Sequence, residues 1–205
     1  MIRTAFEFIK GELDAYISDR ENDPANYSPG SIVEVGSVVS PFNNNTSFDS
    51  TKHITITLIG VEEERREGKR PYMVATNDRK LLKLNPPVEL NLLLLFIAHS
   101  ADYSTALRDL SDVAAFFQAN TVFDEQHFPN LNATVLSPDE KPWQLIERLS
   151  FRLHNLSFEQ QNNLWGMFGS KYVPSVIYKM SLLTVLDTRS REATPAIVEL
   201  GVLDK

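Results

Sequence analysis

Residues 88–97 read VELNLLLLFI, and the pattern of this stretch sets the class of fold. Its first half alternates apolar and polar side chains, and its second half is continuously apolar. That change is typical of a central strand whose two faces are both covered. Pro86 and Pro87 end the element before it. The most apolar part, residues 90–98, is far too short to cross a bilayer.

Further strands and helices are expected on both sides of this stretch. Upstream, residues 32–39 are rich in β-branched side chains and residues 53–58 alternate, so both are predicted strands. The start of the chain carries a helical apolar stripe. A second helix follows the central strand, with Asp102 or Ser104 as its N-cap. The apolar faces of these helices are Ile2, Ala5, Phe6, Ile9, Leu13, Tyr16 and Ile17, and Ala106, Leu110, Val113, Ala114 and Phe117.

The C-terminal half predicts a strand, a short helix and a last strand. Residues 123–135 have the composition of a loop, and residues 147–156 alternate like a strand. Ser157 and Gln160 form a capping box, and Gly169 is expected to end the helix that it opens. Residues 175–186 are predicted as the last strand.

Together these elements predict an α+β fold: a single domain whose mostly antiparallel sheet packs with two main helices and a short third helix. The domain is expected to span residues 1–187. Two interpretations of the C-terminal tail, residues 188–205, stay open: it clasps a neighbouring subunit, or it is disordered.

Composition narrows the function. The chain has 205 residues, no cysteine and a formal net charge of −7, which argues against a nucleic-acid binder and excludes disulfides and thiolate-metal sites. Arg65 and Arg66 directly follow Glu62, Glu63 and Glu64, so their positive field is partly cancelled. The start of the chain does not have the pattern of a signal peptide. We therefore expect the protein to be located in the cytoplasm, whose reducing conditions fit a chain without cysteine.

Motifs of catalysis and cofactor binding are not found. The four histidines are scattered and show no metal-ligand spacing. Successive residues of the Glu62–Glu64 run point to opposite faces of an extended chain, so they do not converge on one substrate atom. Gly166 to Lys171 lacks the spacing of a phosphate loop. We therefore predict no enzyme activity, no cofactor, no metal and no membrane span.

Several segments together resemble one family, the cap proteins of extracellular contractile injection systems of the antifeeding prophage and Photorhabdus virulence cassette type, in their conserved N-terminal domain. The most specific segment is residues 164–179, LWGMFGSKYVPSVIYK. The other segments follow the family's order and span nearly the whole chain: residues 5–9 with Leu13, residues 57–64, residues 86–92 with Phe96, and Tyr103, Ala106, Leu107, Leu110, Ser111 and residues 116–118.

The resemblance implies a six-fold ring of identical subunits that closes the distal end of sheath and inner tube and fixes particle length. It implies contacts with the terminal sheath and tube proteins, assembly in the cytoplasm, and a place in a particle that is released from the cell. Many relatives carry an additional C-terminal region. The residues predicted to contact partners are Glu62, Glu63, Glu64, Arg65, Arg66, Trp165 and Tyr172.

Alternatives remain at this point. Trp165, Met167, Phe168 and Tyr172 crowd one short helix and its exit, and they serve either the core or an interface. A different structural role, as a tube-end or baseplate adaptor, also fits the composition. So does a soluble enzyme whose site is assembled from distant residues, which predicts a pocket of convergent polar side chains with perturbed pKa values. A monomeric binding module is the last alternative.

Overall fold

The computed structural model describes residues 1–39, 48–49, 51–64, 72–75, 80–84, 88–137, 144–184 and 192–195. Within these ranges the chain forms helices and strands in the following order: α1 (Ile2–Glu21), β1 (Val33–Val35), β2 (Ile54–Glu63), β3 (Tyr72–Ala75), β4 (Lys80–Leu84), β5 (Val88–Ala98), α2 (Tyr103–Ala119), β6 (Val122–Asp124), β7 (Arg148–Leu153), α3 (Phe158–Phe168), β8 (Ser175–Thr184) and β9 (Glu192–Pro195).

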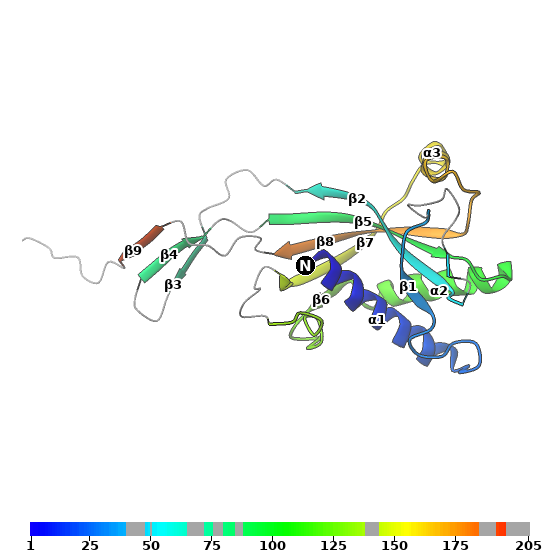
Figure 1. Ribbon diagram of the computed structural model, residues 1–205, viewed down its shortest axis with the longest axis horizontal. Coiled ribbons are helices and arrows are strands. Elements are labelled where there is room, and N and C mark those ends of the chain that lie inside the picture. Colours follow the sequence, from blue (N-terminus) through cyan, green and yellow to red (C-terminus); the bar gives the residue numbers. More distant parts are fainter. Residues whose placement is uncertain are drawn as a thin grey trace, which may run out of the picture.

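The main sheet has six strands in the order β1-β2-β5-β8-β7-β6. All neighbours in it are antiparallel except β1 and β2, which are parallel. β5 lies between β2 and β8 and pairs with both along nearly its whole length (Figure 1). The predictions of a central strand at residues 88–97, and of an α+β fold with a mostly antiparallel sheet, are confirmed.

The two long helices cover one face of this sheet. Alternate residues of β5, Leu92, Leu94 and Phe96, are 0% exposed and belong to the large core that α1 and α2 complete. Aromatic rings fill the centre of that core, with the ring of Phe117 4.3 Å from that of Tyr178. The predicted apolar stripe of α1 therefore faces the sheet. For α2 the prediction is right for Ala106, Val113 and Phe117, but Ala114 is exposed and Phe116 is buried in its place. Asp102 is the N-cap of α2.

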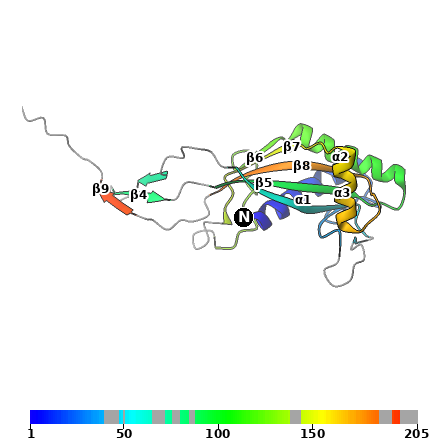
Figure 2. The same ribbon diagram turned by 90° about the horizontal axis from the view of Figure 1, so that it is seen from above.

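The short helix α3 lies on the opposite face, at one end of the sheet (Figure 2). Its Trp165 packs in a smaller core with Leu95 and Ile97, the residues of β5 that point away from α1 and α2. Ser157 and Gln160 form the predicted capping box. Gly169 ends the helix at φ 62°, a left-handed conformation that glycine adopts without steric cost.

A second sheet of three strands, in the order β3-β4-β9, was not predicted. Both views show it apart from the six-stranded sheet, beyond the ends of β2, β5 and β8 (Figures 1 and 2). β9 also corrects the expectation that residues 175–186 are the last strand. Its sequence, Glu-Ala-Thr-Pro, has no apolar alternation, because it pairs with β4 and not with the main sheet.

Two other boundaries differ from the expectation. Only Val33–Val35 of the predicted strand at 32–39 pairs with β2, and the amides of Ile32 and Val33 bind the side chain of Asp14 in α1. Residues 123–135, expected as a loop, begin within the short edge strand β6. Three residues of edge strand carry too little alternation to be recognised in the sequence.

Asp14 of α1 fixes the chain entering β1. Its side chain is 4% exposed and accepts hydrogen bonds from three backbone amides, those of Gly30, Ile32 and Val33. The two carboxylate oxygens thereby accept the hydrogen bonds of three amides in the turn before β1 and at its first residue. A buried amide that loses its acceptor costs free energy of the order of a whole hydrogen bond.

We expect Asp14→Ala to lower the free energy of unfolding by about 2–4 kcal/mol, because it leaves three amides without their acceptor. Urea denaturation measures the effect. Asp19→Ala, on the exposed side of the same helix, is the control and should change stability by less than about 0.5 kcal/mol. An Asp14→Ala protein as stable as the control would contradict this prediction, because it would mean that water accepts the hydrogen bonds of these amides equally well.

A second carboxylate is held at the contact between α1 and α2. Asp112 is 2% exposed, and its Oδ1 lies 2.9 Å from Nε of Arg20. Its other oxygen has no partner in the described part of the chain. Burial, with a further contribution from the nearby Glu21 carboxylate, raises the pKa of Asp112 to about 6, although Arg20 opposes this shift.

The raised pKa predicts a stability change with pH. Since the native protein holds this proton more tightly than the unfolded chain, the contribution of Asp112 to stability is fully present below pH 3.8 and is lost as the pH rises through about 6. Asp112→Asn should remove this fall and gain about 1–3 kcal/mol over the natural chain between pH 4 and 7. Denaturation at a series of pH values tests this, with Asp19→Asn as control; parallel curves for Asp112→Asn and the natural chain would contradict it.

Candidate functional site

The predicted contact residues Glu62 and Glu64 lie on or just after β2, at the end away from β1. Glu62 is 59% exposed, and its Oε2 lies 3.6 Å from Nζ of Lys179. The Oε2 atom of Glu64 accepts a hydrogen bond from Nδ2 of Asn91, 2.9 Å away. Both side chains thus reach the face of the sheet that carries α3, while Glu63 is exposed at the end of the strand. Arg65 and Arg66 lie outside the described residues.

The two predicted aromatic contact residues differ in their surroundings. Trp165 is 4% exposed and lies in the smaller core under α3, where its indole nitrogen has no partner in the described part of the chain. Tyr172 is 57% exposed, with its ring 5.9 Å from the Trp165 ring. Of the two, Tyr172 alone offers surface to a partner. Met167 and Phe158 of α3 are also exposed, at 68% and 92%.

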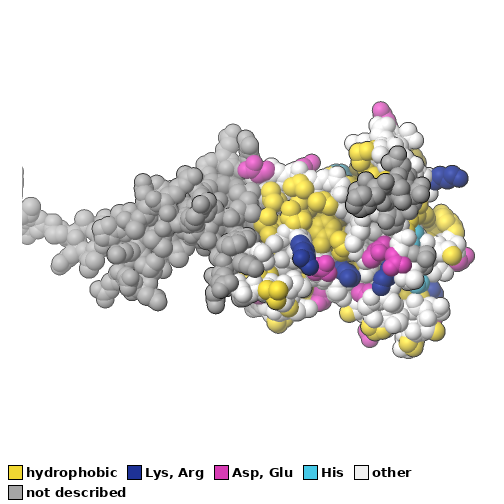
Figure 3. All heavy atoms as spheres, viewed as in Figure 1, with side chains coloured by type: hydrophobic (Ala, Val, Ile, Leu, Met, Phe, Trp, Pro, Cys, Tyr) yellow, Lys and Arg dark blue, Asp and Glu magenta, His cyan; other side chains and the backbone are white. Residues whose placement is uncertain are grey.

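An apolar groove lies beside the outer edge of β2. The groove is open and is lined by Ile2 and Phe6 of α1, Val35 of β1, and Ile56 and Leu58 of β2, among others. Figure 3 shows apolar side chains gathered on this face, over β2 and β5 near the start of α1. Leu58 and Val61 are 38% and 51% exposed there. This surface suits a macromolecular contact better than it suits a small polar ligand.

The sheet face that carries α3 is covered only at one end. Beyond α3 it presents polar side chains that line a second groove, including Glu64, Glu89, Arg148, Arg152 and Lys179. The acidic members come from the β2 and β5 side, and the basic members come from β7 and β8. One face of a single chain therefore runs from acidic at one edge to basic at the other.

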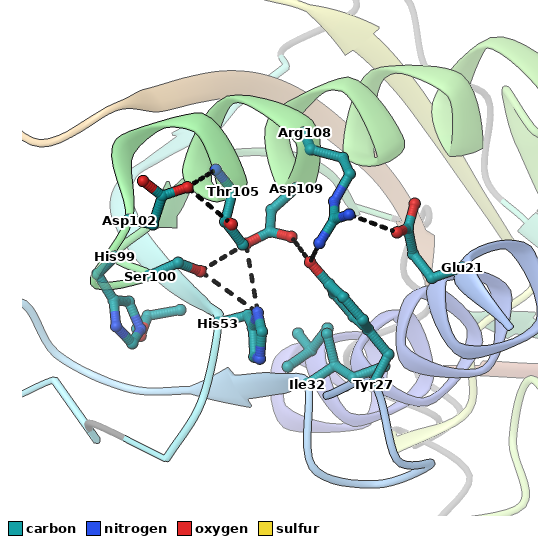
Figure 4. Close-up of polar contacts among 12 residues, drawn as sticks. Glu21, Tyr27, Ile32, His53, His99, Ser100, Asp102, Thr105, Arg108 and Asp109 are labelled. Carbon is teal, nitrogen blue, oxygen red and sulfur yellow. Dashed lines mark hydrogen bonds and ion pairs between the residues drawn. The ribbon is translucent and has the colours of Figure 1, made fainter. Parts of the chain in front are cut away.

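The densest cluster of polar side chains surrounds the buried carboxylate of Asp109, which is 0% exposed (Figure 4). Its Oδ1 accepts a hydrogen bond from the hydroxyl of Tyr27 at 2.7 Å, and its Oδ2 accepts one from Ser100 at 2.6 Å. The imidazole of His53 lies 3.4 Å from the same Oδ2. Arg108 donates to the Tyr27 hydroxyl and forms an ion pair with Glu21.

This cluster joins the ends of α1, β2 and β5 to α2. Burial, together with the hydrogen bond to Asp109, raises the pKa of Tyr27 above its usual range, so the phenol stays protonated and keeps donating. Each carboxylate oxygen of Asp109 has a partner, which is what a buried charge requires to be tolerated. The arrangement is that of a structural lock between secondary-structure elements.

Serine, histidine and aspartate meet here, but their geometry is not that of a hydrolase. A catalytic serine donates its proton to histidine, whose other nitrogen binds the carboxylate. The Ser100 hydroxyl instead donates to Asp109, and both residues are nearest to the same atom, Nδ1 of His53. In the described residues no group of three or more side chains could hold a metal ion, and no helix is long and apolar enough to span a membrane.

The sequence signalled some of these features and not others. The scattered histidines gave no sign that His53 and Asp109, far apart in the chain, meet in the fold. Arg148 and Arg152 were recognisable in the sequence only as the polar side of an alternating strand. Nothing in the sequence indicated that they share a face with Glu64 and Glu89. The apolar groove had no signal, because its lining comes from α1, β1 and β2, and each contributes only a few residues.

Two solved structures are similar to this fold. One is the sheath/tube terminator, in the extended state, of the PVC extracellular contractile injection system, with a TM-score of 0.58, 12% identity, and coverage of 100% of this chain and 63% of that one. The other is the cap of the anti-feeding prophage, its tube terminating cap, with a TM-score of 0.57, 12% identity, and coverage of 98% and 60%. The chain thus spans less than two thirds of the length of either.

The sequence itself matches a family. No curated protein is significantly similar to it. The family model described as the Pvc16 N-terminal domain, however, matches residues 5–199, which is almost the whole chain. The chain belongs to the Pvc16 N-terminal domain family.

Proposed function

We propose that this chain is a structural subunit that terminates the sheath and inner tube of a contractile injection system as a ring, and so fixes the length of the particle. The observation that carries the proposal is the agreement of two comparisons. The family match covers residues 5–199, and the fold is similar, over nearly all of the chain, to two solved terminators of such systems.

The surfaces of the chain support a role in assembly. A ring subunit needs surface beyond its own core that is suited to neighbours, and it needs no catalytic site. The apolar groove beside β2 and the charged face beyond α3 are such surfaces, whereas the Asp109 cluster has its hydrogen bonds satisfied within the chain. In the described residues, therefore, no arrangement of side chains supports a catalytic role.

The proposal includes the partners and the place of assembly. Six copies form the ring, which contacts the terminal sheath subunits and the last ring of the tube; assembly takes place in the cytoplasm, and the protein leaves with the particle. Glu62, Glu63, Glu64, Arg65, Arg66 and Tyr172 are the candidates for charge-complementary and aromatic contacts. The tail from residue 188 is a candidate to clasp a neighbour.

Particle length tests the function. Removing this chain from cells that make the particles should give particles without a closed end and with a much wider spread of lengths, because nothing then stops the growth of sheath and tube. Electron microscopy measures the lengths, and restoring the chain is the control. An unchanged, narrow length distribution would contradict the proposal; particles that lack a baseplate would favour the adaptor role.

A further inference from the structure

We propose that residues 197–203 of each copy form an additional β-strand on the main sheet of the next copy, along the outer edge of β2. The inference rests on the proposed ring, and it names the segment and the surface through which one copy holds the next. It is drawn from the unpaired edge of β2, from the apolar groove beside that edge, and from the direction in which the chain leaves β9.

The outer edge of β2 is paired over only part of its length. β1 pairs with Ile54–Ile56, and no strand in the described part of the chain pairs with residues 57–63 on that side. After Gly36 the chain turns to the other face of the sheet, where Val38 is buried in the smaller core. The edge is therefore open where β1 ends, and open edges pair readily with other chains.

Backbone groups along this open part point outward. The carbonyl of Ile56 accepts a hydrogen bond from the β1 side, and the amide of Glu64 donates to β5. Backbone groups alternate between the two sides of a strand, apart from the bulge that follows Leu58. Counting in steps of two from Ile56 and from Glu64 places the N–H and C=O groups of Leu58 and Val61 on the side away from β5, where a further strand can pair with them.

The side chains at this edge favour an apolar neighbour. Leu58 and Val61 lie opposite Leu94 and Leu92, whose side chains belong to the large core, so both point to the face that carries α1. They are 38% and 51% exposed. The apolar groove runs beside Leu58 to the start of α1. A strand added here lays one row of its side chains against the groove, and we expect that row to be apolar.

A segment of this chain has the matching pattern. Residues 196–205 read AIVELGVLDK and lie outside the described residues. In an extended segment Val198, Leu200 and Val202 form one wholly apolar row, while the opposite row is mixed. Residues 197–203 are as many as the residues in the open part of β2, so one segment can cover the whole of it.

The tail leaves its own chain in a direction away from the main sheet. β4 leads toward β5, and β9 is antiparallel to β4, so β9 runs outward (Figure 2). Its last residue, Pro195, pairs with Lys80, which lies about 13 Å along β4 from Leu84, the residue nearest to β5. Turning back past β4 would use about four residues of the tail and leave too few to cover its own β2 edge. The segment therefore suits the edge of a neighbouring copy.

The contact has the form that a ring requires. Each copy gives one strand and accepts one, and the two surfaces differ, which is the heterologous type of contact that closes into rings. Main-chain hydrogen bonds provide the affinity of an added strand, and the groove provides its specificity for an apolar row of side chains.

Cross-linking in purified particles tests the contact. The natural chain has no cysteine, so Val61→Cys and Leu200→Cys can be introduced together and joined with a short bismaleimide. We expect a ladder of linked chains up to the full ring on a denaturing gel, and no ladder from either single variant. The matched control is Val122→Cys with Leu200→Cys, because Val122 is 41% exposed and lies at the opposite edge of the sheet. This control should give no ladder.

Two results of this experiment would overturn the inference. A double variant that gives only internally linked monomers would mean that the tail returns to its own sheet. A ladder of equal yield from the Val122→Cys control would mean that the tail has no defined place on the neighbouring copy.

Proline at position 61 supplies a second measurement. Val61→Pro removes the amide with which a further strand pairs, but an edge strand tolerates proline where the N–H points away from its partner. The urea midpoint of the isolated chain should therefore stay unchanged, while the amount of chain bound to particles falls by about tenfold. Val61→Thr keeps the amide and the shape of the side chain, and should bind as the natural chain does. Equal binding of all three chains would overturn the inference.

The failure of this contact can be told from the failure of the proposed function. If the chain is present on purified particles but Val61 and Leu200 do not link, the tail is not the strand at this edge, and the terminator role stands. If the chain is missing from purified particles altogether, the proposed function fails, and the contact fails with it.

Discussion

The position of β5 constrains everything else in this molecule. It is hydrogen-bonded along both edges, to β2 and to β8, and its two faces support two separate cores. A strand enclosed in this way cannot slip by one residue, because a slip would exchange Leu92, Leu94 and Phe96 with Leu93, Leu95 and Ile97. The register of the neighbouring strands, and hence every row across the sheet, follows from this fixed strand.

The two faces of the main sheet are covered unequally by helices. α1 and α2 cover one face, whereas α3 covers only the end of the other. The uncovered half is polar and carries opposite charges at opposite edges. The small edge strands β1 and β6 leave parts of β2 and β7 unpaired within the described residues. Strand edges of this kind are available for pairing with other chains.

Much of the fold could be predicted from the sequence, because strong periodicity reports burial. The continuous apolar run after Asn91, the stripe from Ile2 to Ile17, and the capping box of Ser157 and Gln160 each have a local physical cause that the structure confirms. The three-stranded sheet was missed because short strands outside the core need no long alternation. β9 has none.

The candidate surfaces were predicted less well, for a related reason. The acidic run at Glu62 is visible in one segment, so the sequence could name it. The basic side of the same polar face, at Arg148 and Arg152, becomes visible only when β7 is placed two strands beyond β5. The sequence left Trp165 open between a core and an interface, since an aromatic residue on a short helix serves either, and only its depth under α3 distinguishes them.

The position of the chain on the assembled particle tests the central claim most directly. A small tag placed on this protein and decorated with gold should appear by electron microscopy at one end of each particle only, the end away from the baseplate. Label at the baseplate, or along the length of the sheath, would contradict the account of this chain as a terminator.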